Sequence, residues 1–170
     1  FGQIDAIPIT LDTKDPQEFI HTVKLLEKNF AGINLEDISS PKCYDIEDEL
    51  KKIMNIPVFH DDQHGTAIAA LAALLGALEV VGKKIEEEKG VMNGAGAAGT
   101  AIMKLIHKYG VGSIIAVDSK GIIGDSRTDL NDEKKALLPY LDASHTGSLD
   151  DAIAGADIFI GVSKPGLLTP

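Results

Sequence analysis

The sequence predicts an α/β fold, in which helices cover both faces of a parallel sheet, preceded by part of a second α/β domain. Three observations support this. Short apolar runs that are typical of buried strands alternate with helical patterns along the chain. Acidic or small polar residues follow several of these runs directly. A glycine-rich turn at residues 93–99 joins an apolar run to a well-formed helical pattern.

Strands and helices are expected to alternate in the first part of the chain. Asp15 followed by Pro16 is typical of an N-cap and the first position of a helix. Pro41, followed by several acids, marks a second helix start for the same reason. The expected elements are a strand at 4–11, a helix at 16–29, a strand at 32–35, a helix at 41–50 and a strand at 56–59.

The second part opens with a helix rich in alanine and leucine, at residues 66–81. This helix is apolar almost all round, so we expect it to be buried on more than one side. Ser148 and Asp151 form a capping box that opens a short helix. The other expected elements are a strand at 90–92, a helix from residue 100, a strand at 113–118, a helix at 133–141, a short helix at 149–154 and a strand at 157–162.

Gly94, Gly96 and Gly99 form a G-x-G-x-x-G motif between a strand and a helix. In a dinucleotide site these glycines allow a tight turn, a close approach to the pyrophosphate and close helix–strand packing. Asp118 ends the next strand, where an acid can accept a hydrogen bond from a ribose hydroxyl. The pattern predicts a Rossmann-like sheet that binds a dinucleotide. The alternative is a tight turn in another kind of α/β protein.

Three carboxylates, Glu36, Asp37 and Asp62, follow two short apolar strands. Crowded like charges are unfavourable unless a cation neutralises them, and oxygen ligands without cysteine suit Mg²⁺ or Mn²⁺. The alternative is that these acids are separate, solvated or helix-capping residues. The neighbouring His60 and His64 are expected to be loop or capping residues rather than ligands.

Composition excludes several classes of function. The formal net charge of −10 argues against nucleic acid and anionic membrane surfaces as partners. Cys43 is the only cysteine, so an internal disulfide or a cysteine metal cluster is excluded and a cytoplasmic setting fits. We expect Cys43 to be a half-buried small residue. No membrane span is expected, because Gly76 and Glu79 interrupt the longest apolar stretch.

The chain contains five characteristic segments, Ile33–Ile38, Ile56–Ala67, Asn93–Gly99, Val117–Gly121 and Phe159–Gly166. In order and spacing along nearly the whole chain, these segments closely resemble the small bacterial and archaeal malic enzymes. The resemblance implies oxidation of malate with NAD or NADP and decarboxylation to pyruvate and CO₂, with Mg²⁺ or Mn²⁺, in an enzyme that is a homodimer. The H-D-D-Q-H-G-T-A segment is highly specific.

The resemblance also assigns individual residues. Glu36, Asp37 and Asp62 match the metal ligands, and Asp61 matches the acid that pairs with a catalytic lysine. Asp118 favours a free ribose hydroxyl and Lys120 offsets its charge, which predicts a preference for NAD with NADP tolerated. The residues assigned to cofactor binding are Asp62, Gly94, Ala95, Gly96, Ala97, Ala98, Gly99, Asp118, Ser119, Lys120, Val162 and Ser163.

Residues 1–62 are expected to be the C-terminal part of a substrate and metal domain, and residues 63–170 a truncated NAD(P)-binding domain. The family's lysine base and tyrosine acid are expected before Phe1, and its substrate loops after Pro170. The chain alone is therefore expected to be inactive. Two other functions stay open: a metal-independent amino-acid-type dehydrogenase, which the three acids disfavour, and a non-catalytic nucleotide-binding module.

Overall fold

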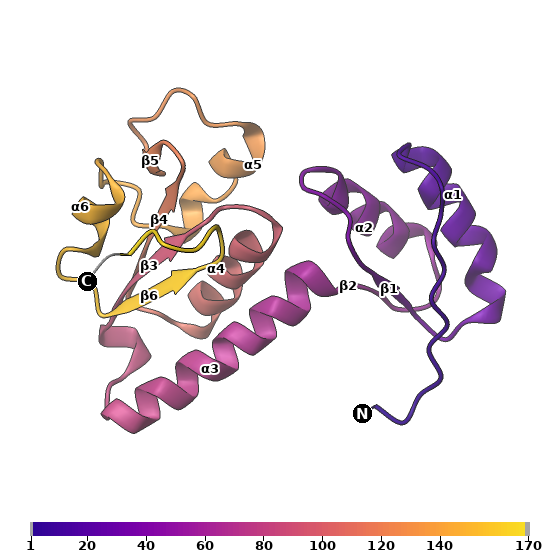
Figure 1. Ribbon diagram of the computed structural model, residues 1–170, viewed down its shortest axis with the longest axis horizontal. Coiled ribbons are helices and arrows are strands. Elements are labelled where there is room, and N and C mark those ends of the chain that lie inside the picture. Colours follow the sequence, from indigo (N-terminus) through magenta and orange to yellow (C-terminus); the bar gives the residue numbers. More distant parts are fainter. Residues whose placement is uncertain (1, 169–170) are drawn as a thin grey trace.

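The computed structural model describes residues 2–168, and within these residues the strands form two sheets (Figure 1). The smaller sheet pairs β1 (Ile33–Leu35) with β2 (Val58–His60) in parallel. The larger sheet has the strand order β5-β4-β3-β6. Its strands are β3 (Lys89–Asn93), β4 (Ser113–Asp118), β5 (Gly121–Ile122) and β6 (Ile158–Gly161). β3 pairs in parallel with β4 and β6, while β5 is antiparallel to β4.

The smaller sheet packs with α1 (Pro16–Leu26) and α2 (Lys42–Ile53), which confirms both expected helices. The Asp15 carboxylate accepts hydrogen bonds from the backbone N–H groups of Gln17 and Glu18, so it is the N-cap that the sequence predicts. The smaller sheet and these two helices share an apolar core. Its buried residues are Ile20, Val23, Leu35, Ile46, Leu50, Met54 and Val58.

The expected strand at residues 4–11 is wrong. These residues have no regular structure, and the Ile4 side chain is 82% exposed. A strand needs a neighbour for its backbone N–H and C=O groups, and β1 and β2 pair only with each other among the described residues. Alternating residue types were therefore not sufficient to form a strand here.

Helices cover both faces of the larger sheet, which confirms the predicted α/β architecture. α3 (Thr66–Val81) and α4 (Ala97–Tyr109) lie on one face, in a core that includes Met92, Ile114 and Ala116. α6 (Leu149–Ile153) covers the other face, in a cluster that includes Val91 and Val117. Because side chains alternate along a strand, neighbouring residues of β3 and β4 supply the two cores.

The expectation that α3 is buried on several sides is wrong. One stripe, with Ala67, Leu74 and Leu78, is buried in the core of the larger sheet. The opposite side is open, and Ile68 and Val80 are 58% and 86% exposed. By length and composition alone, the stretch Asp61–Val81 would suffice to cross a membrane, a test that core helices of soluble proteins also meet. Figure 1 shows α3 running along one side of the larger sheet toward β2.

The helix expected at 133–141 is interrupted. It consists of α5 (Asp132–Lys135) and a 3-10 turn at Leu138–Tyr140. Pro139 has no N–H to continue a helical ladder, which accounts for the break. The capping box is confirmed, because the Ser148 hydroxyl accepts from the Asp151 N–H while the Asp151 carboxylate accepts from the Ser148 N–H. Cys43 is fully buried rather than half-buried, and burial raises the pKa of its thiol.

The predicted boundary between residues 62 and 63 falls inside a π-helical turn, Asp61–Gly65, that continues directly into α3. This turn connects β2 of the smaller sheet to the first helix of the larger one. The division into two domains stays a prediction. The turn itself carries two of the acids that the sequence singled out, Asp61 and Asp62.

Candidate functional site

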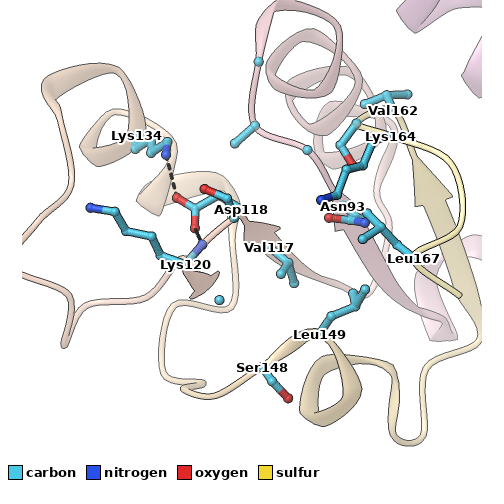
Figure 2. A pocket seen from close by; sticks show the side chains of 16 residues that line it. Asn93, Val117, Asp118, Lys120, Lys134, Ser148, Leu149, Val162, Lys164 and Leu167 are labelled. Carbon is cyan, nitrogen blue, oxygen red and sulfur yellow. Dashed lines mark hydrogen bonds and ion pairs between the residues drawn. The ribbon is translucent and has the colours of Figure 1, made fainter.

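A cleft of about 860 Å³ lies at the carboxyl ends of β3, β4 and β6. It is lined by the turn after β3, by the residues that follow β4 and by those that follow β6. Figure 2 shows Asp118 at one side of the cleft, with Val162 and Lys164 across from it and Leu149 below. Ligands of open α/β sheets bind in this location, where the strand order reverses around the first strand.

The glycines of the turn have different structural roles. Gly94 has a φ of +119°, which a residue with a side chain rarely adopts. A Cβ at Gly99 would lie 1.8 Å from the Gly94 carbonyl oxygen, so only glycine allows α4 to approach the turn this closely. A Cβ at Gly96 would meet nothing within 4 Å, because Gly96 lines the cleft. The three positions match the roles that the motif predicts.

The start of α4 is suited to an anion. Gly96 is the N-cap residue and supplies no side-chain cap. The first N–H groups of a helix have no intrahelical partner, and the helix dipole adds a partial positive charge there. A pyrophosphate would satisfy these groups. The glycine turn and the uncapped start of α4 therefore fit a dinucleotide.

The structure brings most of the assigned cofactor-binding residues together. Ala97, Ala98 and Gly99 are the first residues of α4 and do not line the cleft, and Asp62 lies in the π-helical turn outside the cleft lining. Their assignments, like the others, stay predictions. The assigned residues that line the cleft are Gly94, Ala95, Gly96, Asp118, Ser119, Lys120, Val162 and Ser163.

The Asp118 carboxylate is surrounded by hydrogen-bond donors. It accepts from Arg127 Nη1 at 2.8 Å, from the Lys120 N–H at 2.8 Å and from Lys134 Nζ at 2.5 Å. Lys120 Nζ instead binds Asp129, at 2.7 Å. Burial alone would raise the pKa of the Asp118 carboxyl, but the hydrogen bonds from Arg127 and Lys134 lower it below its ordinary value.

Arg127 and Lys134 were missed by sequence reasoning. Both lie in the polar stretch after β5, where nothing in the residue pattern indicates that they fold back onto Asp118. The one available signal was that both residues are basic and follow Asp118 by nine and sixteen positions. Asp118, which was expected to accept a hydrogen bond from a ribose hydroxyl, thus already accepts hydrogen bonds from two cationic side chains.

The second group of acids lies at the ends of β1 and β2, which are adjacent and parallel. The Asp37 N–H donates to Asp62 Oδ2 at 2.9 Å, and Asp37 has a φ of +57°. The Glu36 carboxylate instead accepts from Asn34 Nδ2 at 3.0 Å. Among residues 2–168, no group of three or more acidic, histidine or cysteine side chains is placed to hold a metal ion.

The expected convergence of Glu36, Asp37 and Asp62 is therefore incomplete. Three carboxylates repel each other without a cation, and only Asp37 and Asp62 are joined directly, through a backbone N–H. The donor set, oxygen alone, still fits a hard divalent cation. The metal assignment stays a prediction.

The π-helical turn is anchored by Glu47 of α2, another residue that sequence reasoning missed. Glu47 is 3% exposed and accepts from Gln63 Nε2 at 3.1 Å, while His64 Nε2 lies 2.8 Å from its Oε1. His64, expected to be a loop or capping residue, is thus part of a side-chain network. His60 is fully buried, and neither of its ring nitrogens has a hydrogen-bond partner.

A family model for the malic enzyme, NAD binding domain, matches residues 63–169, which contain α3, the glycine turn and the cleft. The chain belongs to the malic enzyme family. It is 53% identical to the bifunctional malic/malolactic enzyme of Bacillus subtilis over 171 aligned positions. It is also 53% identical to the NAD-dependent malic enzyme of Geobacillus stearothermophilus and 48% identical to the NADP-dependent malic enzyme of Escherichia coli.

Solved malic enzymes share the fold. The NAD-dependent malic enzyme of Thermotoga maritima superposes with a TM-score of 0.94 at 47% identity, over 99% of this chain and 46% of that one. The malic enzyme of Pyrococcus horikoshii gives 0.82 at 39% identity, over 98% of this chain and 40% of that one. The curated relatives align with 99% of this chain, which spans 42%, 35% and 22% of their respective lengths.

Proposed function

We propose that this malic enzyme chain supplies the dinucleotide cleft and the acidic residues for the oxidative decarboxylation of malate to pyruvate and CO₂. The observation that carries the proposal is the cleft itself. The cleft combines the glycine turn, the uncapped start of α4 and the ends of β3, β4 and β6. The chain that forms it is similar to a malic enzyme along 99% of its length. The dependence on a divalent metal is part of the proposal.

The residues of the chain have distinct roles in this reaction. In this reaction a bound dinucleotide would supply the hydride acceptor, and a divalent cation would supply positive charge beside the substrate oxygens. Gly94 and Gly96 leave room for the pyrophosphate beside the start of α4. Glu36, Asp37 and Asp62 are the acids that would hold the cation, and the hydrogen bond from the Asp37 N–H keeps Asp62 beside Asp37.

Asp61 has the role of an acid that stabilises a catalytic lysine. Several lysines of this chain are engaged elsewhere: Lys51 with Glu47, Lys83 with Glu88 and Asp157, and Lys134 with Asp118. General acid–base groups typically contribute about 10²–10⁴-fold each to a rate. We therefore propose that residues 1–170 alone bind the cofactor but do not turn malate over.

An assay of product formation tests the reaction. The protein expressed from its complete reading frame is incubated with malate, Mn²⁺ and either NAD or NADP, and reduced cofactor, pyruvate and CO₂ are measured together. Equal amounts of the three products support the proposal. Formation of oxaloacetate or lactate instead, or no malate-dependent reaction, contradicts it. A dehydrogenase of the amino-acid type would be active with amino acids and without metal.

The cations around Asp118 are expected to decide the choice between NAD and NADP. Lys134 lines the cleft and its ammonium lies at the Asp118 carboxylate, whereas the Lys120 ammonium is bound to Asp129. Lys134→Met is expected to weaken NADPH binding about tenfold and NADH binding much less, because a phosphate gains a charge-assisted hydrogen bond from lysine.

Lys120→Ala is the matched comparison. Its effect on the ratio of the two affinities is expected to be smaller, since the Lys120 ammonium is held at Asp129, which does not line the cleft, whereas Lys134 is held at Asp118, which does. Quenching or enhancement of nicotinamide fluorescence on titration with NADPH and NADH measures both affinities. A larger loss of NADPH binding in Lys120→Ala than in Lys134→Met would contradict this prediction and would show that Lys120 binds the phosphate.

A further inference from the structure

The turn that carries Asp61 and Asp62 has an unusual backbone. Residues Asp61–Gly65 form a single π-helical turn before α3, with the Thr66 N–H bonded to the carbonyl oxygen of Asp61. Such turns are rare and are less stable than regular helix, so they persist where surrounding contacts hold them.

The contacts come from Glu47, in the middle of α2. Its two carboxylate oxygens face Gln63 Nε2 at 3.1 Å and His64 Nε2 at 2.8 and 3.0 Å. Lys51 Nζ, one helical turn further along α2, completes the set at 2.7 Å from Glu47 Oε1. Glu47 and Gln63 are both buried, so a lost hydrogen bond would leave a polar group without water to replace it.

The acids lie on the same turn as the residues that Glu47 binds. Gln63 and His64 bind α2, while the neighbouring Asp62 binds the Asp37 N–H and Asp61 folds back over Gly65. A Cβ at Gly65 would lie 2.1 Å from Asp61 Oδ1, so the turn also leaves space for this carboxylate. The placement of both acids therefore depends on the conformation of the turn.

We propose that Glu47 is a positioning residue, which anchors the π-helical turn through Gln63 and His64 and thereby fixes Asp61 and Asp62. The role rests on the proposed function, in which Asp62 helps to hold a cation and Asp61 pairs with a lysine. Glu47 itself does not contact the cation or the substrate. A side chain behind the ligands that sets their orientation typically changes metal affinity about 10–100-fold when it is altered.

The Asp37 amide offers a direct readout, because its N–H donates to Asp62 at 2.9 Å. Nuclear magnetic resonance spectra of the ¹⁵N-labelled chain are compared for the wild type, Glu47→Gln and the control Glu49→Gln, the same change on the same helix. In Glu47→Gln an NH₂ donor replaces one carboxylate oxygen, so the side chain loses its charge and one of the two acceptors that face Gln63 and His64. We expect the Asp37 resonance to move in Glu47→Gln and to stay in Glu49→Gln, whose carboxylate pairs with Lys52.

The affinity for Mn²⁺, measured by electron paramagnetic resonance, is the second readout. We expect Glu47→Gln to weaken it at least about tenfold and Glu49→Gln to leave it unchanged. A folded Glu47→Gln chain with an unmoved Asp37 resonance overturns the positioning role. If Glu47→Gln does not fold, Gln63→Met removes one of the anchoring bonds, and an unmoved Asp37 resonance in that variant overturns the role equally.

The two readouts separate the inference from the function on which it rests. A wild-type chain that does not bind Mn²⁺ contradicts the proposed metal site, while the Asp37 resonance still decides whether Glu47 controls the turn. Mn²⁺ binding that is retained in Glu47→Gln, together with a moved Asp37 resonance, shows that the turn does not position the metal ligands and overturns the inference as stated.

Discussion

Gly99→Ala is expected to weaken dinucleotide binding strongly and to destabilise the chain. The new Cβ would lie 1.8 Å from the Gly94 carbonyl oxygen and 2.9 Å from its carbonyl carbon, so the turn or α4 must move. Because the clash is with backbone, we expect a cost of about 3 kcal/mol, at the upper end for overpacked sites, and a melting temperature lower by about 6–12 °C. A displaced turn no longer fits the pyrophosphate, and we expect NADH binding to weaken about 100-fold, which corresponds to about 2.8 kcal/mol.

Two other glycines provide matched controls for Gly99→Ala. Gly96→Ala adds a methyl group that meets no protein atom within 4 Å but enters the cleft, so it should reduce NADH binding and leave the melting temperature unchanged. Gly76→Ala, in the middle of α3 and also without a neighbour within 4 Å, should leave binding unchanged and stabilise the helix by about 0.5–1 kcal/mol. Calorimetry and NADH fluorescence measure both effects. Normal NADH binding by Gly99→Ala would contradict the role of the glycine turn.

Asp118→Asn is expected to produce the other large effect, a loss of stability near neutral pH. The Asp118 side chain is 7% exposed and binds both Arg127 and Lys134. Removing its charge leaves two cations without this partner. Breaking a buried pair typically costs about 3–5 kcal/mol, and we expect about 3 kcal/mol because Arg127 keeps Asp129 as a partner. Urea denaturation of the wild type and the variant measures the difference.

The difference should depend on pH in a defined direction. The folded state lowers the pKa of Asp118 below its ordinary value of 3.8. Its contribution is therefore fully present above pH 3.8 and is lost as the pH falls through the lowered value. Asp132→Asn, at a fully exposed position, is the control and should change stability by less than about 0.5 kcal/mol. A difference between the wild type and Asp118→Asn that is the same at neutral and acid pH would contradict the proposed charge contribution.

The elements with strong local signals could be predicted from sequence. Asp15 before Pro16, the Ser148 capping box and the glycine turn each combine a residue type with a backbone requirement, and each is present in the structure. The cleft followed from the same reasoning, because parallel strands bring their carboxyl ends to one edge of the sheet.

Features that depend on contacts between distant residues could not be predicted in this way. The alternating residues 4–11 lack a partner strand, and the apolar α3 is covered on one side within residues 2–168. Arg127 reaches Asp118, and Glu47 reaches Gln63, only through the tertiary fold. Neither residue belongs to a recognisable motif, so local spacing carried no information about its partner.

Titration of the ¹⁵N-labelled chain with NADH, followed by nuclear magnetic resonance, tests most directly whether the cleft holds the dinucleotide. Saturable shifts are expected for amides of the glycine turn, of Asp118–Lys120 and of Val162–Ser163, while the amides of α1 and α2 remain unchanged. The same titration of Gly96→Ala should give much smaller shifts at equal NADH. Shifts confined to other parts of the chain, or none at saturating NADH for the folded wild type, would contradict the assignment of this cleft as the dinucleotide site.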